Sequence, residues 1–105
     1  MVVVDFTRKE EDDGKIKYTL DVQGHADYDP GHDIVCAACS VLTETYFHAV
    51  LKNVEKIASM YKHPGDCKMV FVTDKEGTVA DTIYQTILSG FKLLSYTYPD
   101  NVHVK

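Results

Sequence analysis

The sequence predicts an α/β fold, a small two-layer or sandwich arrangement in which a mixed sheet carries two helices. Two segments near the N-terminus have strand composition or period-two alternation, two later segments have helical spacing, and short turn clusters separate them. The predicted order is strand, strand, helix, strand, helix, strand (β-β-α-β-α-β). Residues 1–105 are about the length of one domain, and 45% of them are hydrophobic, enough for a packed core.

The N-terminal part reads as an antiparallel hairpin. Residues 2–8 begin with three valines and continue with β-branched and aromatic residues, which is typical of a strand. The following strand alternates apolar with polar residues, and its apolar positions are Ile16, Tyr18, Leu20 and Val22. Because a charged segment that ends in a glycine, residues 9–14, separates the two strands, we expect them to pair.

From Ile34 the spacing becomes helical and predicts one long core helix as far as Tyr61. Asp33 stands at the N-cap, where its carboxylate can accept a hydrogen bond from the Cys36 amide. The segment 63–65, His-Pro-Gly, ends this helix. A third strand is expected at 68–73.

The C-terminal part is predicted to hold a turn, a second helix and a short strand. The turn lies at 75–77, and Thr78 and Asp81 have the spacing of a capping box at the start of a helix over residues 80–94. Residues 102–104 then form a short final strand.

Composition limits the partners. Sixteen acidic and 11 basic residues give a net charge of -5, which argues against nucleic-acid binding and leaves a basic polypeptide as a fitting partner. The acidic first fifteen residues do not resemble a signal peptide, so we expect a cytoplasmic protein whose three cysteines are reduced. Charged residues interrupt the apolar stretch 34–61, so we expect no membrane span.

Cys36 and His25 are the residues that could carry chemistry. Cys36 falls in the first turn of the long helix, where the helix dipole favours a thiolate, and the amides there are natural oxyanion donors. His25 lies eleven residues upstream on a loop that can fold back. Together they suffice for nucleophilic acyl transfer, with cysteine attacking and histidine protonating the leaving amine. A buried apolar cysteine and a strand-end histidine are the structural alternatives.

Two other thiol chemistries are compatible with the cysteine pattern. Cys36 and Cys39 form a C-x-x-C at a helix start, as in thiol-disulfide redox proteins, although Cys39 is better explained as apolar filling. A zinc site from Cys36, Cys39, His63 and Cys67 would span some 25 helical residues, nearly 40 Å, so no metal and no cofactor is expected. Cys67 reads as a strand-edge residue without chemistry.

The motif Gly24-His25-Ala26, then Gly31, Asp33-Ile34-Val35-Cys36-Ala37-Ala38 and Ser40, resembles the signature of the ribosomal-processing cysteine protease family (Prp). The likeness continues to Tyr98-Pro99. It implies a single cysteine-protease domain over residues 1–105, an intracellular bacterial endopeptidase and a homodimer. Its substrate would be the precursor of large-subunit ribosomal protein number twenty-seven, whose short N-terminal extension is removed after an aromatic-rich sequence.

This resemblance also implies roles for single residues. Cys36 matches the nucleophile, His25 the general base and acid, and Gly24 a glycine of the loop that opens for substrate. Asp33 and Ser40 match polar supporting positions, and a purely structural role fits both of them as well. The glycine at position 31 is expected to be a hinge of the loop.

Cys39 and His32 depart from the family pattern, and Cys39 keeps the redox alternative open. The three hypotheses make different demands. A protease needs His25 and Cys36 but not Cys39, and a redox protein needs both cysteines. A ribosome-associated binding module needs none of the three.

Overall fold

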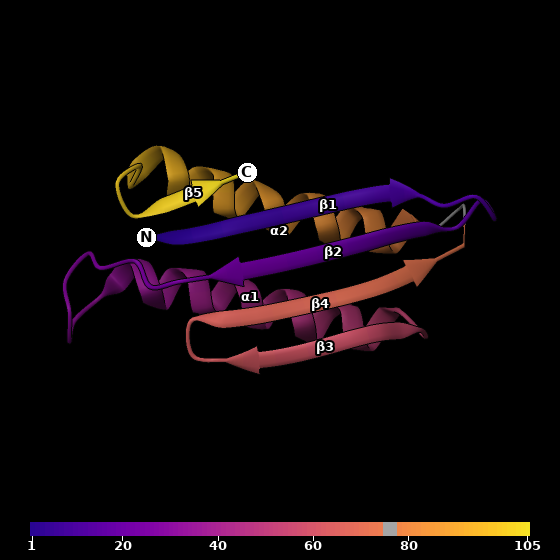
Figure 1. Cartoon of the computed structure of the whole chain (residues 1–105), viewed down its shortest axis with the longest axis horizontal. Helices are drawn as coiled ribbons and strands as arrows, with labels where there is room; N and C mark the ends of the chain where they lie inside the picture. Colours follow the sequence, from indigo (N-terminus) through magenta and orange to yellow (C-terminus); the bar gives the residue numbers. More distant parts are fainter. Residues whose placement is uncertain (75–77) are drawn as a thin grey trace.

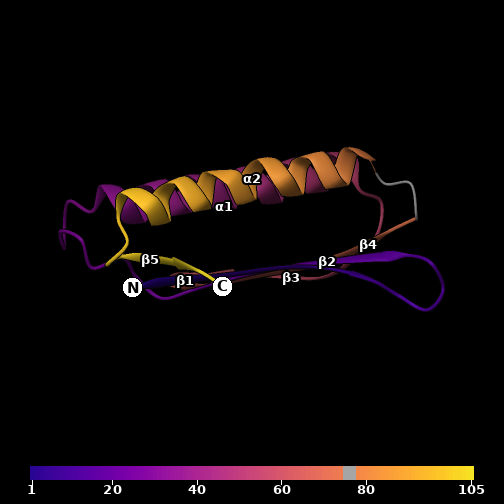
Figure 2. The same ribbon diagram turned by 90° about the horizontal axis from the view of Figure 1, so that it is seen from above.

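The protein, described here by a computed structural model, has two layers, a five-stranded sheet with both helices on one face (Figures 1 and 2). The structure describes residues 1–74 and 78–105, without the side chain of Thr78. The predicted turn at 75–77 and the capping box of Thr78 lie outside the described residues. The elements are β1 (Val2–Glu10), β2 (Ile16–Gln23), α1 (Ile34–Asn53), β3 (Ile57–His63), β4 (Asp66–Thr73), α2 (Thr78–Thr97) and β5 (Val102–Val104).

The sheet is mixed, as predicted, and its strand order is β3-β4-β2-β1-β5. The expected hairpin of β1 and β2 is confirmed, with Val4 opposite Val22 in an antiparallel register. The expected C-terminal strand also forms, and β5 pairs with β1 in parallel. The α/β class is therefore confirmed, and the observed order is β-β-α-β-β-α-β.

One predicted element is wrong. The first helix ends at Asn53 instead of Tyr61, because Val54 is extended and residues 57–63 form β3. Ile57 and Tyr61 have helical spacing, yet the segment is an edge strand that pairs antiparallel with β4, from Ile57 opposite Phe71 to His63 opposite Asp66. Periodicity cannot separate the two states in so short a run, and the pairing partner decides. This strand turns the chain back toward the start of α1.

The core lies between the helices and one face of the sheet. Alternate residues of β1, β2 and β4 point into it, and its largest fully buried side chains include Tyr18, Phe71 and Phe91. By length and composition α1 could cross a membrane, so the charges in this stretch do not by themselves exclude a span. In this structure α1 packs as a core helix and buries Val35, Cys39, Thr43, Tyr46, Phe47 and Val50.

The two helices pack closely through a glycine of α2. A Cβ atom at Gly90 would lie 2.7 Å from Cδ2 of Leu42 on α1. Glycine inside a helix lowers stability by about 1 kcal/mol relative to alanine. At position 90 its missing side chain allows α1 and α2 to pack closely.

Candidate active site

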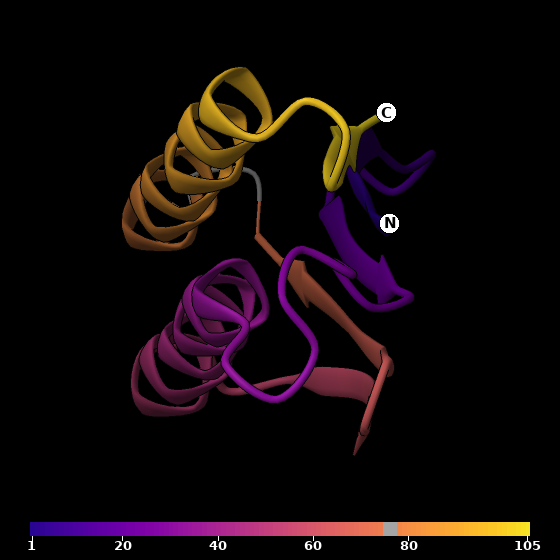
Figure 3. The same cartoon turned by 90° about the vertical axis from the view of Figure 1, so that its left-hand side faces the viewer.

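A cavity of about 390 Å³ opens at the end of the molecule where α1 begins. Figure 3 looks onto this end and shows the loop that joins β2 to α1 beside the helices and the sheet. The loop, the first turns of α1 and the turn between β3 and β4 supply most of the cavity wall. Its lining includes Gly24, His25, Cys36, Cys39, Ser40, Thr43, Glu44, Lys62, His63, Gly65, Asp66 and Cys67.

Asp33 caps α1, as predicted, and also organises the loop before it. Its Oδ1 accepts a hydrogen bond of 2.8 Å from the Cys36 amide, and its Oδ2 accepts bonds from the amides of Tyr28 and Asp29. These bonds, the one from Cys36 first, hold the pKa of Asp33 below its ordinary value. One carboxylate thus fixes the start of the helix and the fold of the loop.

Cys36 is half-buried, and its sulfur faces the loop. The backbone N–H of Ala26 donates to Cys36 Sγ at 3.3 Å. The helix-start amides expected to serve as oxyanion donors are already used, because the Cys36 amide bonds to the side chain of Asp33 and the Ala37 amide to its carbonyl. The Ala26 amide, which sequence reasoning did not single out, is the donor seen at the sulfur.

His25 is exposed at the mouth of the cavity and lies against the turn between β3 and β4. A Cβ atom at Gly65, whose φ is +73°, would come within 2.7 Å of His25 Nε2. The Gly24 amide also donates to the Gly65 carbonyl at 2.8 Å. Gly65 was predicted only as part of a helix stop, because its closeness to His25 depends on the pairing of distant strands.

The remaining predicted residues lie around this pair. Gly24 has φ +95°, and a Cβ atom there would lie 2.3 Å from the Met1 carbonyl oxygen, so only glycine fits. Gly31 has φ +91° with no neighbour within 4 Å of a Cβ atom, so its requirement is conformational. Ser40 is exposed on the cavity wall, one helical turn beyond Cys36.

The other cysteines also face this cavity. Cys39 is buried, and desolvation, with contributions from Cys36 and Asp33, raises its pKa to about 11. Cys67 lies in β4 between β2 and β3, so the expectation of a strand-edge position is wrong. Burial raises its pKa as well.

The expected separation of nearly 40 Å between Cys36 and Cys67 is also wrong, because β3 brings His63 and Cys67 back to the cavity that Cys36 and Cys39 line. Within residues 1–74 and 78–105, however, no group of three histidine, cysteine or acidic residues is arranged to hold a metal ion.

Comparison with known proteins adds a family to this geometry. The family described as cysteine protease Prp matches residues 1–103. The ribosomal processing cysteine protease Prp of Staphylococcus aureus strain Mu50 is 29% identical, over 99% of this chain and 97% of its own length. A protein of the same name from strain NCTC 8325 gives the same values.

Two solved structures have the same fold. Both are of an essential ribosomal processing protease Prp from S. aureus, one with a covalently linked product peptide (TM-score 0.80, 27% identity) and one with a substrate peptide (TM-score 0.75, 26% identity). Each covers 100% of this chain and 98% of its own. By its family match and its fold, the chain belongs to the cysteine protease Prp family and is a cysteine protease.

Proposed function

We propose that this protein removes the N-terminal extension from the precursor of large-subunit ribosomal protein number twenty-seven, with Cys36 as nucleophile and His25 as general base and acid. One observation carries the proposal: Cys36 and His25 come from different segments and line the same cavity, and a backbone N–H points at the sulfur of Cys36. A peptide in this cavity would contact both side chains.

In the acylation step, His25 accepts the proton of the Cys36 thiol, and the thiolate attacks the carbonyl carbon of the scissile peptide bond. The Ala26 amide stands where it can donate to the negative charge that forms beside the sulfur. His25 then returns the proton to the amine nitrogen, and the carbon–nitrogen bond breaks. The mature fragment leaves, and the extension stays bound as a thioester.

Hydrolysis of the thioester uses the same histidine. His25 takes a proton from water, and the hydroxide attacks the thioester carbon. The carbon–sulfur bond breaks and Cys36 leaves as the thiolate, which regains its proton from His25. The released extension carries a new C-terminal carboxylate, and the enzyme returns to its starting state.

The substrate is proposed from the relatives and from charge. The S. aureus relatives are named for ribosomal processing, and one was solved with a substrate peptide. This chain carries a net charge of -5, which suits a basic polypeptide. Asp66 lies on the cavity wall, where Glu44 is paired with Lys62 at 2.6 Å. Cleavage efficiency should therefore fall as salt rises to about 0.5 M, and an unchanged efficiency would exclude electrostatic steering.

The test is mass spectrometry of a peptide that spans the precursor's extension, incubated with the wild type and with Cys36→Ala, His25→Ala and Cys39→Ala. We expect one cut by the wild type and by Cys39→Ala, and none by the other two. If Cys39→Ala failed as completely as Cys36→Ala, the thiol-disulfide alternative would gain support. If no folded variant cleaved the peptide, the substrate would be wrong.

We also propose a cytoplasmic homodimer. Its support in the structure is an apolar groove on the outside of the helix layer, lined by Ala37, Ala38, Val41, Leu42, Gly90, Leu93, Leu94 and Thr97. Two large hydrophobic residues of this groove, Val41 and Leu93, are 64% and 68% exposed. Sedimentation of the wild type and Leu93→Asp tests the proposal, which predicts a dimer that the substitution dissociates.

A further inference from the structure

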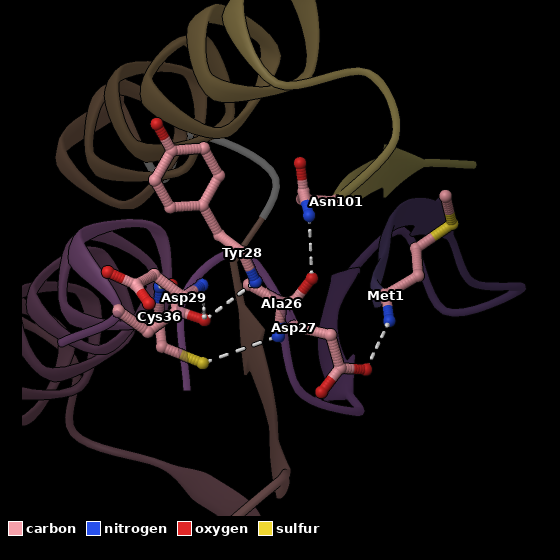
Figure 4. A network of polar contacts seen from close by, with 8 residues as sticks. Met1, Ala26, Asp27, Tyr28, Asp29, Cys36 and Asn101 are labelled. Carbon is pink, nitrogen blue, oxygen red and sulfur yellow. Dashed lines mark hydrogen bonds and ion pairs between the residues drawn. The ribbon is translucent and has the colours of Figure 1, made fainter. Parts of the chain in front are cut away.

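A side chain from the C-terminal turn contacts the loop that faces Cys36. The Asn101 amide Nδ2 donates to the Ala26 carbonyl oxygen at 2.9 Å, across 75 positions of sequence (Figure 4). Ala26 is only 1% exposed, so this carbonyl lies in a largely dry environment. The N–H of the same residue donates to Cys36 Sγ at 3.3 Å. Asn101 thus holds the carbonyl of Ala26, and the N–H of Ala26 contacts the sulfur of Cys36.

Asn101 is itself firmly placed. Its backbone N–H donates to the Tyr98 carbonyl at 3.0 Å, and its carbonyl accepts from the Val2 amide at 2.8 Å. The turn is tied to the loop a second time through the rings of Tyr98 and Tyr28, whose centroids lie 5.2 Å apart at an interplanar angle of 76°. The amide of Asn101 therefore projects from a turn anchored to the sheet.

We infer that Asn101 is a positioning residue, which acts on the nucleophile by fixing Ala26 so that its N–H faces the Cys36 sulfur. The inference rests on the proposed function in one respect, the role of Cys36 as nucleophile. A hydrogen bond from a fixed N–H stabilises a thiolate more than a thiol. When Asn101 no longer holds the carbonyl, the loop gains freedom and the N–H moves off the sulfur.

An asparagine side chain is suited to holding the Ala26 carbonyl. Its amide carries a donor at every pH, so the contact to Ala26 does not depend on titration. An aspartate at 101 would keep the shape of the side chain but place acceptor oxygens against an acceptor carbonyl. Asn101→Asp therefore removes the hydrogen bond and preserves side-chain volume but adds a negative charge, whereas Asn101→Ala removes the hydrogen bond and the volume without adding a charge. A loss in both variants is therefore not an effect of the added charge.

A matched control exists at the far end of α1. Asn53 Nδ2 donates to the Ala49 carbonyl at 2.8 Å, which is the same kind of side-chain-to-backbone bond in an exposed place. Asn53→Ala deletes one such bond without touching the loop. Any effect shared by Asn53→Ala and Asn101→Ala is therefore a general consequence of losing a side-chain-to-backbone hydrogen bond.

The experiment measures two quantities on wild type, Asn101→Ala, Asn101→Asp and Asn53→Ala, each confirmed as folded by circular dichroism. One is the rate at which iodoacetamide modifies Cys36 between pH 6 and pH 9, followed by peptide mass mapping. The other is peptide cleavage, resolved into kcat and KM. We expect both Asn101 variants to lose about tenfold in kcat with little change in KM, and to be alkylated several-fold more slowly at pH 7. Asn53→Ala should match the wild type.

Three results would overturn the inference: both rates unchanged in folded Asn101→Asp, an equal loss in Asn53→Ala, or a rise in KM with unchanged alkylation. If Asn101→Ala does not fold, Asn101→Asp decides the outcome, since its shape is conserved. The alkylation rate can be measured whether or not Cys36 is the nucleophile. Cleavage by Cys36→Ala would therefore refute the proposed function and leave the alkylation comparison valid.

Discussion

The two ends of the sandwich carry similar turns in different surroundings. At the end opposite the cavity, Gly14 joins β1 to β2 with φ +84°, and nothing lies within 4 Å of the place a Cβ atom would take. At the cavity end, Gly65 joins β3 to β4 with φ +73°, and the ring of His25 occupies that place. Both turns need glycine for the same backbone reason, but one of them also gives room to a proposed catalytic side chain.

The aromatic part of the core lies between the two ends and differs from the cavity end in its packing. The rings of Tyr18 and Phe71 stack with centroids 4.9 Å apart, and Phe6 meets Tyr46 and Tyr84 edge to face. Most residues that line the cavity, in contrast, are exposed or half-buried, His25, Cys36 and Ser40 among them. Stability should therefore depend on the core, and activity on the cavity end.

The largest expected effect on stability tests this division. Phe71 is fully buried, so Phe71→Ala should lower the free energy of unfolding by about 3–5 kcal/mol. His25→Ala, at an exposed position, should change it by less than about 1 kcal/mol while cleavage is lost. Urea titration gives both values. Equal destabilisation by the two substitutions would show that the cavity end also carries the fold.

The glycine pair gives the next largest effect. Gly65→Ala and Gly14→Ala should each cost about 1–2 kcal/mol of stability, because alanine is strained at positive φ. Only Gly65→Ala should also displace the His25 ring, and we expect kcat/KM for peptide cleavage to fall about a hundredfold. Equal losses of activity in the two variants would mean that strain, not contact with His25, governs the cavity end.

Acid should weaken the cavity end through Asp33. Its folded pKa lies below the ordinary value of 3.8, so its charge stabilises the fold above that value. This contribution declines as the pH falls through the lowered pKa. Asp33→Asn removes the charge and keeps one acceptor oxygen for the cap, while its NH2 group replaces the second acceptor, so the variant resembles Asp33 in its protonated form. Thermal unfolding should separate wild type from Asp33→Asn near pH 7, and the two should approach each other as the pH falls through the lowered pKa of Asp33. A gap that persists in acid would point to geometry instead.

The smallest expected effect concerns two cysteines one helical turn apart. With a pKa of about 11, roughly one Cys39 side chain in a thousand is ionised at pH 8, and it is buried as well. Iodoacetamide at pH 8 should therefore label Cys36 and leave Cys39 unmodified, as peptide mass mapping would show. Rapid labelling of Cys39 would indicate that the helix start opens, and would revive the redox alternative.

Local pattern was sufficient for much of this molecule. The alternation in residues 16–22 predicted β2, and the acidic residue before an apolar helix predicted the cap at Asp33. The local pattern gave a wrong prediction for β3, because apolar residues spaced three and four apart are compatible with a helix. An edge strand gains its hydrogen bonds from a partner strand later in the chain, and no local signal carries that pairing.

The sequence by itself determined the hairpin, the capped helix with Cys36 in its first turn, and the two residues proposed to react. Tertiary structure decided which other residues surround them. Strand β3 reverses the chain and brings Gly65 under His25, and the turn before β5 brings Asn101 to Ala26, 75 positions away. Caps and alternation depend on residues within a few positions of each other, whereas these contacts depend on the register of the assembled sheet.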